Sequence, residues 1–192
     1  SAGSSSASTI LRAAVAARAA ARSAEPGSAS SAARQIVEGI ELRARVYFAG
    51  TSPLNVASGE MYQTFMIEAA GGDAVGKDLT GFWNEVKLEQ VAVWNPDVIF
   101  VPTYGEISVE SFTGAEEWAA IKAMQEGRVY RLPNLTGPWD TPAPDSILGI
   151  IWMAQTLYPD MVNLDCPAQT QHVYEMFYDY AMPLEEAQGL CG

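Results

Sequence analysis

The stretch VAVWNPDVIFVPTYGE (residues 91–106) decides the fold class of this chain. A helix that starts near Glu85 runs into it and must end before Pro96, because proline lacks the amide hydrogen that continues a helix. The next residues, Val98–Val101, form an uninterrupted apolar run, which is typical of a parallel strand covered on both faces. A turn at Pro102–Gly105 follows. Helix, short buried strand and turn form the repeating unit of an α/β protein.

The same order of elements recurs on both sides of this stretch. Downstream, EEWAAIKAMQEGRVYRLPN (residues 116–134) predicts a helix that Gly127 ends and then a strand at Val129–Leu132. Upstream, the apolar run RVYFAG (residues 45–50) predicts the first strand of the series. Strands that alternate with helices pair in parallel. The expected fold class is therefore α/β, a three-layer sandwich with a mainly parallel central sheet.

The remaining segments fit around this framework. A helix is expected from Ser58 to Ala70, with Met61, Phe65 and Ala69 at i, i+4 spacing on one face. Proline at the start and end of apolar runs marks further helices. The full set of other expectations is a helix through Ile36 and Ile40, a helix from Pro142 or Pro144 to Pro159, a helix from Pro167 through Val173, Phe177 and Tyr180, and loops at TSPLNVAS (51–58) and LTGFWNE (79–85).

The composition changes near the amino end, which suggests a domain boundary. Residues 1–31 are rich in Ala and Ser, and their only acidic residue is Glu25. The rest of the chain is strongly acidic. We therefore expect residues 1–31 to form a helical segment and linker, and residues 32–192 to form the folded domain.

The stretch GGDAVGKD (residues 71–78) begins like a phosphate-binding loop. Such a loop follows a strand and opens a helix, so that backbone amides and the positive helix end face the phosphates. Here the expected helix comes first and Gly71 ends it, which places carbonyl groups at this point. Asp78 also stands where a Ser or Thr hydroxyl would reach magnesium. We expect a helix end and a turn rather than a nucleotide site.

Charge and cysteine content narrow the classes of partner. A formal net charge of −12 and a pI near 4.4 argue against nucleic acid, since phosphate backbones need a basic surface. No apolar run is long enough to span a bilayer, and any export signal has been removed or lies outside this sequence. Cys166 and Cys191 are compatible with a disulfide and equally with two free thiols.

The loops at the carboxyl ends of the strands are the expected binding site, because α/β sheets bind ligands there. These loops and the GFWN segment carry aromatic and neutral polar side chains, which suit recognition better than catalysis. His172 is the only histidine, so general-base and triad schemes have little support. We expect no catalytic residue, no metal ligand and no cofactor. The candidate ligand-binding residues are Ser52, Trp83, Asn84, Tyr104, Asn134 and Trp139.

Three further stretches carry a family resemblance when taken in order. They are EAAGGDAVGKDLTGFWNEVKLEQVAVWNPDVIFVPTYGE, WAAIKAMQEGRVYRLPN and PWDTPAPDSILGIIWMAQTLYPD. Together they resemble the carboxyl-terminal lobe of the substrate-binding proteins that serve ABC importers for iron-siderophores, haem, cobalamin and some oxyanions. The resemblance runs from about Arg45 to Ala181.

The resemblance implies a two-lobed receptor whose ligand lies between the lobes. It implies an exported protein, periplasmic or anchored to the outer face of a membrane, that delivers its ligand to an ABC permease in the membrane. In the family an acidic residue of each lobe contacts the permease, and by position this residue is Asp140 here. Residues 1–31 do not resemble the amino-terminal lobe, so we expect that lobe to be missing from this chain.

We accordingly expect the chain to be the carboxyl-terminal lobe of an importer's substrate-binding component, without enzymatic activity. Its ligand would be an iron-siderophore or similar metal chelate, haem, a corrinoid or an oxyanion. Two other hypotheses stay open. The chain could be a fragment of a metallocluster oxidoreductase of related fold, which needs cysteine ligands near strand ends, or a protein-interaction module that uses the Trp83 or Trp139 surface.

Overall fold

Four parallel strands form the central sheet of the computed structural model, which describes residue 40, residues 42–162 and residues 164–191. The strand order is β3-β1-β5-β6. The predicted strands are confirmed, whereas β3 was not predicted. The segment 1–31 and Ile36 lie outside the described residues. The bounds are β1 Arg45–Phe48, β3 Asp73–Ala74, β5 Val98–Val101 and β6 Val129–Arg131.

Side chains of the central strand β5 alternate between two separate hydrophobic cores. Val98 and Phe100 belong to one core, and Ile99 and Val101 belong to the other. All four are 0% exposed. Successive side chains of a strand point to opposite faces of the sheet, so a strand buried throughout must be covered on both faces. The continuous apolar run that predicted this arrangement is confirmed.

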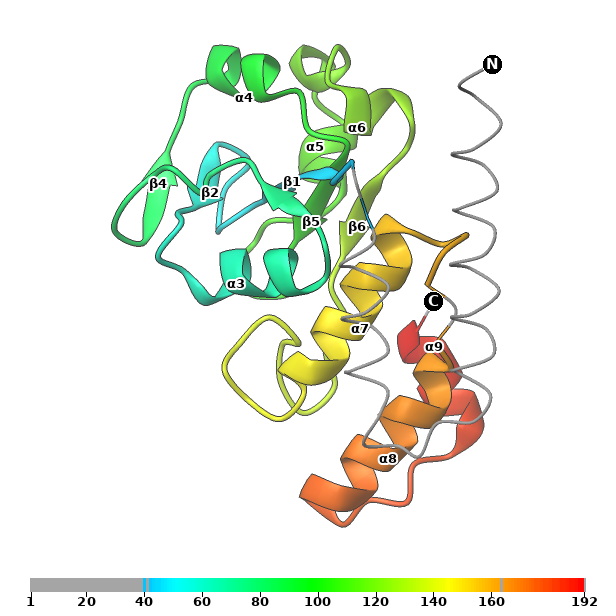
Figure 1. Cartoon of the computed structure of the whole chain (residues 1–192). Coiled ribbons are helices and arrows are strands. Elements are labelled where there is room, and N and C mark those ends of the chain that lie inside the picture. Colours follow the sequence, from blue (N-terminus) through cyan, green and yellow to red (C-terminus); the bar gives the residue numbers. More distant parts are fainter. Residues whose placement is uncertain (1–39, 41, 163, 192) are drawn as a thin grey trace.

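Helices cover both faces of the sheet and complete the three layers (Figure 1). The core that contains Phe100 is closed by α3, α7, α8 and α9, and the core that contains Ile99 is closed by α4, α5, η2 and α6. The three-layer α/β sandwich is therefore confirmed. The bounds are α3 Tyr62–Ala69, α4 Leu88–Trp94, α5 Glu110–Thr113, η2 Glu116–Trp118, α6 Lys122–Gln125, α7 Ser146–Leu157, α8 Cys166–Tyr178 and α9 Leu184–Cys191.

A two-stranded antiparallel ladder follows the carboxyl end of β1. It joins β2 (Asn55–Ala57) to β4 (Trp83–Glu85). The prediction of loops at 51–58 and 79–85 is therefore wrong at these residues. Each strand has three residues, too few to show an alternating pattern in the sequence. A bridge between Ala49 and Val56 makes the ladder continuous with the end of β1.

Helix α3 begins later than predicted and turns a different face to the core. Its first residue is Tyr62, while the Ser58 side chain bonds the backbone of Glu60 and Gly81. Phe65, expected to be buried, is 53% exposed, so the predicted face is wrong there. The buried residues of α3 are Gln63, Thr64, Met66 and Ile67. Two polar side chains on the buried face obscured the apolar periodicity.

The glycines of GGDAVGKD have backbone roles. Gly71 adopts a φ of 87° directly after α3, a conformation that favours glycine at a helix end. A Cβ atom at Gly76 would lie 2.2 Å from the carbonyl oxygen of Ala57, so the two chain segments pass too closely for a side chain. A helix precedes the stretch and the short strand β3 lies within it. The prediction of a helix end rather than a phosphate loop is confirmed.

The helix predicted within residues 116–126 is broken. The 3-10 helix η2 covers Glu116–Trp118 and α6 covers Lys122–Gln125, and α5 precedes both. Trp118 and Ile121 are nearly fully buried, which bends the segment toward the sheet between the two short helices. Gly127 ends α6 with a φ of 65°, as predicted.

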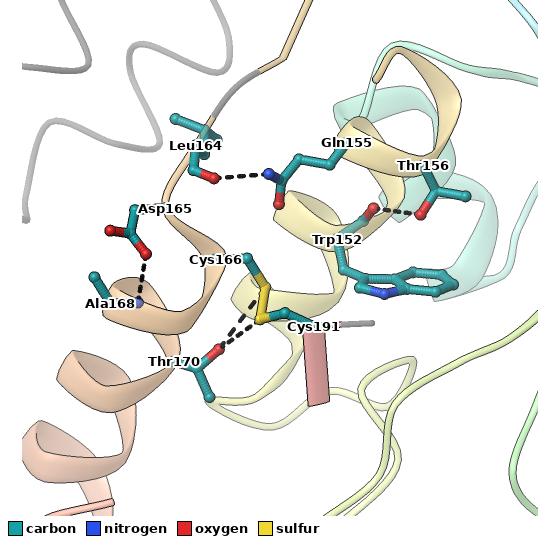
Figure 2. The surroundings of a disulfide bond; sticks show 9 residues. All are labelled: Trp152, Gln155, Thr156, Leu164, Asp165, Cys166, Ala168, Thr170 and Cys191. Atoms are coloured by element: carbon teal, nitrogen blue, oxygen red, sulfur yellow. Dashed lines mark hydrogen bonds between the residues drawn. A yellow bond between two sulfur atoms is a disulfide. The ribbon is translucent and has the colours of Figure 1, made fainter. Parts of the chain in front are cut away.

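A disulfide joins the start of α8 to the end of α9, so the pairing left open by the sequence is present (Figure 2). The Thr170 hydroxyl lies 4.0 Å from the sulfur of Cys166 and 3.6 Å from that of Cys191. Gln155 of α7 donates to the carbonyl of Leu164 at 2.7 Å, just before α8. The α8–α9 hairpin is therefore closed by the disulfide and tied to α7. Helix α9 itself was not predicted.

Removing this disulfide should destabilise the domain. The double variant Cys166→Ala/Cys191→Ala frees a segment with a sequence separation of 25 residues. We expect a loss of about 3 kcal/mol in the free energy of unfolding, because the cross-link restricts the unfolded chain. Urea unfolding without and with a reductant measures it. The reductant should destabilise the wild type and leave the double variant unchanged, and equal stability of both proteins before reduction would contradict the prediction.

A candidate ligand-binding rim at the carboxyl ends of the strands

The loops that follow β1, β5 and β6 meet at one edge of the sheet. We call residues 49–54, 102–106 and 132–145 the rim loops. The Asn134 amide donates to the Thr103 hydroxyl at 3.0 Å, which joins the loops after β5 and β6. A Cβ atom at Gly105 would lie 3.3 Å from Thr51, so the loops after β1 and β5 touch as well. The expected gathering of these loops along one edge is therefore present.

Trp83 stands beside the end of β1. Its ring lies 6.4 Å from that of Phe48, and a Cβ atom at Gly50 would come within 2.8 Å of it. Strand β4 places this half-buried side chain next to the first rim loop. The Asn84 amide instead donates to the carbonyls of Thr80 and Phe82, both at 3.2 Å, and holds its own turn.

Ser52, Tyr104 and Asn134 are the other candidates that reach the surface of the rim loops. Ser52 and Tyr104 are half-buried and Asn134 is exposed. The role of Ser52, Trp83, Asn84, Tyr104 and Asn134 in ligand binding stays a prediction. The structure shows that these residues lie near one another. The strands β1, β4 and β5 and the β6–α7 connection bring them to the same edge of the sheet.

Trp139 does not lie at the surface. It is 0% exposed and belongs to the core that contains Phe100. A Cβ atom at Gly149 of α7 would lie only 2.3 Å from the carbonyl of Trp139, so the loop folds directly onto α7 at this point. The expectation that Trp139 offers an aromatic face to a ligand is wrong in this structure. The side chain fills the core instead.

Asp140 is also buried, at 0% exposed. The expectation of a surface carboxylate at this position is therefore wrong, and a direct permease contact by Asp140 remains an untested prediction. Its Oδ2 accepts the Tyr104 hydroxyl at 2.8 Å, and the Gln63 amide of α3 donates to its carbonyl at 3.1 Å. Within the described residues its Oδ1 has no hydrogen-bond partner, and no salt bridge reaches it.

The surroundings of Asp140 change its acidity. Desolvation raises the pKa of its carboxyl group, and the hydrogen bonds from Tyr104 and Gln63 oppose this only in part. Burial beside Asp140 also raises the pKa of the Tyr104 hydroxyl. An acid without a basic partner in such a site favours its neutral form. The carboxyl group of Asp140 therefore holds its proton more tightly than an exposed aspartate does.

Sequence reasoning missed a second polar cluster behind the rim. Asp145, 1% exposed, accepts the Thr136 hydroxyl at 3.2 Å and the Tyr178 hydroxyl at 2.5 Å. Tyr174 lies 3.3 Å from the Thr136 hydroxyl. Helix α8 supplies both tyrosines, and no local motif links α8 to the β6–α7 loop. Gln63 was missed because the spacing of Met61, Phe65 and Ala69 pointed to a different face of this helix.

The charge content of the rim loops limits their chemistry. Glu106 is the exposed charged residue of these loops, since Asp140 and Asp145 are buried. Among the residues that the structure describes, no group of three or more His, Cys, Asp or Glu side chains is placed to hold a metal ion. Hydroxyl and amide groups predominate. Such groups donate and accept hydrogen bonds to a ligand without changing its covalent bonds.

Two surface hollows of the described chain lie away from the rim. One is lined by Leu79, Val86 and Trp94 together with charged neighbours near the start of α4. The other lies at the amino ends of the strands, beside Arg45, Asp73 and Asp97. Neither contains a candidate ligand-binding residue.

The variant Asp140→Asn should alter the pH dependence of stability. Because the folded state raises the pKa of Asp140, it binds this proton more tightly than the unfolded state does. The wild-type stability contribution of Asp140 therefore falls as the pH rises from its ordinary pKa of 3.8 through the raised folded-state value. Asparagine does not titrate. We expect the variant to gain stability over the wild type as the pH increases.

Urea unfolding at about pH 4 and about pH 7.5 measures this change, with the stability difference between variant and wild type larger at the higher pH. The exposed Asp160→Asn variant reports how much of the change comes from the loss of one negative charge. A stability difference for Asp140→Asn that does not grow with pH would contradict the assignment of a buried, proton-binding acid.

Comparison with known proteins agrees with this geometry. The family model described as periplasmic binding protein matches residues 13–136. The molybdate-binding protein MolA of Haemophilus influenzae is 31% identical over 138 residues, which are 71% of this chain and 39% of MolA. The match to the family model begins inside the Ala/Ser-rich segment, so the domain boundary at residues 31 and 32 stays a prediction.

Solved structures show the same fold. A periplasmic solute binding protein from Veillonella parvula has a TM-score of 0.75 and 25% identity, over 85% of this chain and 52% of that chain. MolA of Haemophilus influenzae bound to molybdate has a TM-score of 0.68 and 27% identity, over 81% of this chain and 50% of that chain. The chain thus spans about half the length of these solved relatives. It belongs to the periplasmic binding protein family.

Proposed function

We propose that this chain is the carboxyl-terminal lobe of the substrate-binding component of an ABC importer, and that its rim loops form one wall of the ligand site. The observation that carries this proposal is the meeting of three loops with neutral donors at the carboxyl edge of the sheet. Ligands of α/β sheets bind at this edge. Relatives about twice as long as the matched region leave room for a second wall.

A small metal oxyanion is the ligand that the rim suits best. The burial of Trp139 removes an aromatic face on which a large planar chelate would stack. The exposed Asn134 and the half-buried Ser52 offer an amide and a hydroxyl. Such donors bind an anion through hydrogen bonds. MolA, the relative with 31% identity, is named for molybdate. Iron-siderophores, haem and corrinoids are the alternative ligands.

The disulfide supports an exported location. Disulfides persist in oxidising compartments such as the bacterial periplasm and are rare in the cytosol. Cys166 and Cys191 are the only two cysteines, and both are used in it. In the described part of the chain, no helix has the length and apolar character to cross a bilayer. We propose the periplasm or the outer face of a membrane as the location, with a permease as the partner.

The disulfide also weighs against the oxidoreductase hypothesis. A metallocluster needs thiolate ligands near the site of chemistry. Both cysteines are oxidised and lie on α8 and α9, away from the rim loops. We therefore propose a binding function without bond-making activity. The relatives named above are likewise described as binding proteins.

Isothermal titration calorimetry tests the ligand class. The complete two-lobed protein that contains this chain is titrated with molybdate, tungstate, a ferric siderophore, haem and cobalamin. We expect heat of binding with the two oxyanions. The variant Asn134→Ala should weaken oxyanion binding about tenfold, because it removes an exposed hydrogen-bond donor to a charged ligand. A response only to chelates would overturn the oxyanion assignment and keep the receptor function.

Gln125→Ala is the matched control for Asn134→Ala. Gln125 is an exposed amide on α6, next to the amino-terminal edge of β6 and remote from the rim loops. We expect its affinity to equal that of the wild type. Absence of binding to every compound in the set would count against the receptor function itself. Equal losses in both variants would place the site somewhere other than the rim.

A further inference from the structure

Two buried aspartates bracket the proline turn of the last rim loop. The turn is Thr141–Pro144, with Asp140 directly before it and Asp145 directly after it. Pro142 and Pro144 are exposed, whereas the two acids are 0% and 1% exposed. Proline fixes φ and restricts the residue before it. The turn is therefore stiff by itself, and its two ends are fixed by whatever holds the acids.

A tyrosine hydroxyl holds each acid, and each tyrosine comes from a different part of the chain. Tyr104, in the loop after β5, donates to Asp140 at 2.8 Å. Tyr178, in the last turn of α8, donates to Asp145 at 2.5 Å. The sequence separations are 36 and 33 residues. These contacts connect the last rim loop to the neighbouring loop on one side and to a helix on the other.

Neither acid has a salt bridge among the described residues. Hydrogen bonds to a buried carboxyl group are strong when nothing else compensates its burial, and losing one leaves the group unsatisfied. Asp140 keeps a bond between its carbonyl and Gln63 when Tyr104 is altered. Asp145 keeps a longer contact to Thr136, at 3.2 Å. The tyrosines are thus the shortest side-chain donors to the two carboxyl groups.

Tyr178 reaches the rim loop from outside the site. Its ring packs against that of Tyr174, with centroids 5.2 Å apart, and 37% of the residue is exposed. Removal of its hydroxyl would leave this ring packing in place. Loss of the hydroxyl therefore destabilises Asp145 and the loop that ends at Asp145, and it leaves the packing of the core unchanged.

From this geometry we propose that Tyr104 and Tyr178 are positioning residues, which lock the β6–α7 rim loop in its binding conformation through Asp140 and Asp145. The proposal rests on the proposed function of the rim. A loop that is already ordered loses less conformational freedom when it binds a ligand, so the lock raises affinity through the order of the loop. Helix α8 thereby acts as a brace for the site.

Hydrogen exchange of the free protein tests the lock directly. In Tyr178→Phe, amides of residues 134–145 should exchange about tenfold faster, because the loop opens locally more often. The matched control is Tyr180→Phe. Tyr180 also packs against Tyr174, with ring centroids 6.4 Å apart. Its hydroxyl, however, donates to Glu186 at 2.6 Å. We expect this control to leave exchange in the rim loop unchanged.

Calorimetry with molybdate, or with whichever compound of the set binds the wild type, gives the functional readout. Tyr178→Phe should weaken binding about fivefold to tenfold, whereas Tyr180→Phe should leave the affinity unchanged. Tyr104→Phe should weaken binding too, but Tyr104 is itself a candidate contact to the ligand, so Tyr178→Phe is the variant that isolates the lock. A structural role alone would lower the unfolding temperature and leave affinity intact. Unchanged exchange and unchanged affinity in Tyr178→Phe would overturn the proposal.

One outcome is that residues 134–145 exchange faster in Tyr178→Phe while neither the wild type nor any variant binds a ligand. This outcome would contradict the receptor function and support the role of Tyr178 in ordering the loop. The opposite outcome is that Tyr178→Phe binds the ligand as the wild type does and its exchange is unchanged. This outcome would contradict the role of Tyr178 in ordering the loop and leave the receptor function supported.

Discussion

The burial of β5 on both faces is the constraint from which the rest of the structure follows. Four consecutive residues, Val98–Val101, have no exposed surface, and they feed two cores in alternation. Helices must therefore cover both faces of the sheet. Neither face is then free for a ligand, and the polar chemistry of the domain is left to the edges. The loops at the carboxyl edge contain the exposed amides and hydroxyls described above.

The same constraint explains what could be predicted from the sequence. A buried strand between a proline-ended helix and a turn has a strong signal, since composition and periodicity agree. The strands at β1, β5 and β6 and the helices α7 and α8 are found where that signal is strong. The three-residue strands β2 and β4 were not predicted. Their pairing depends on a partner about thirty residues away in the sequence and on the bridge that extends β1, and neither leaves a local signal.

The candidate site shows where sequence position and residue type stop being informative. Trp139 lies in a loop that must fall in the expected site, yet the loop bends onto α7 where Gly149 allows close approach, and the ring fills the core. A tryptophan serves a core as readily as a binding site. Asp140 has the position that the family resemblance assigns to a docking acid. The position of a residue along the chain does not show whether its side chain is exposed. Only the fold shows that Tyr104 and Gln63 enclose it.

Burial of Asp140 has a consequence for the electrostatics of the rim. The chain carries a formal net charge of −12, so an anionic ligand approaches against a repulsive field. Desolvation raises the pKa of Asp140, so this carboxyl group, at the edge where that ligand would arrive, holds its proton more tightly than an exposed aspartate does. Tyr104 stabilises the same group while it joins two rim loops. The hydrogen bond from Tyr104 opposes the effect of desolvation, so the contact that joins the two rim loops also limits how far the pKa of Asp140 rises.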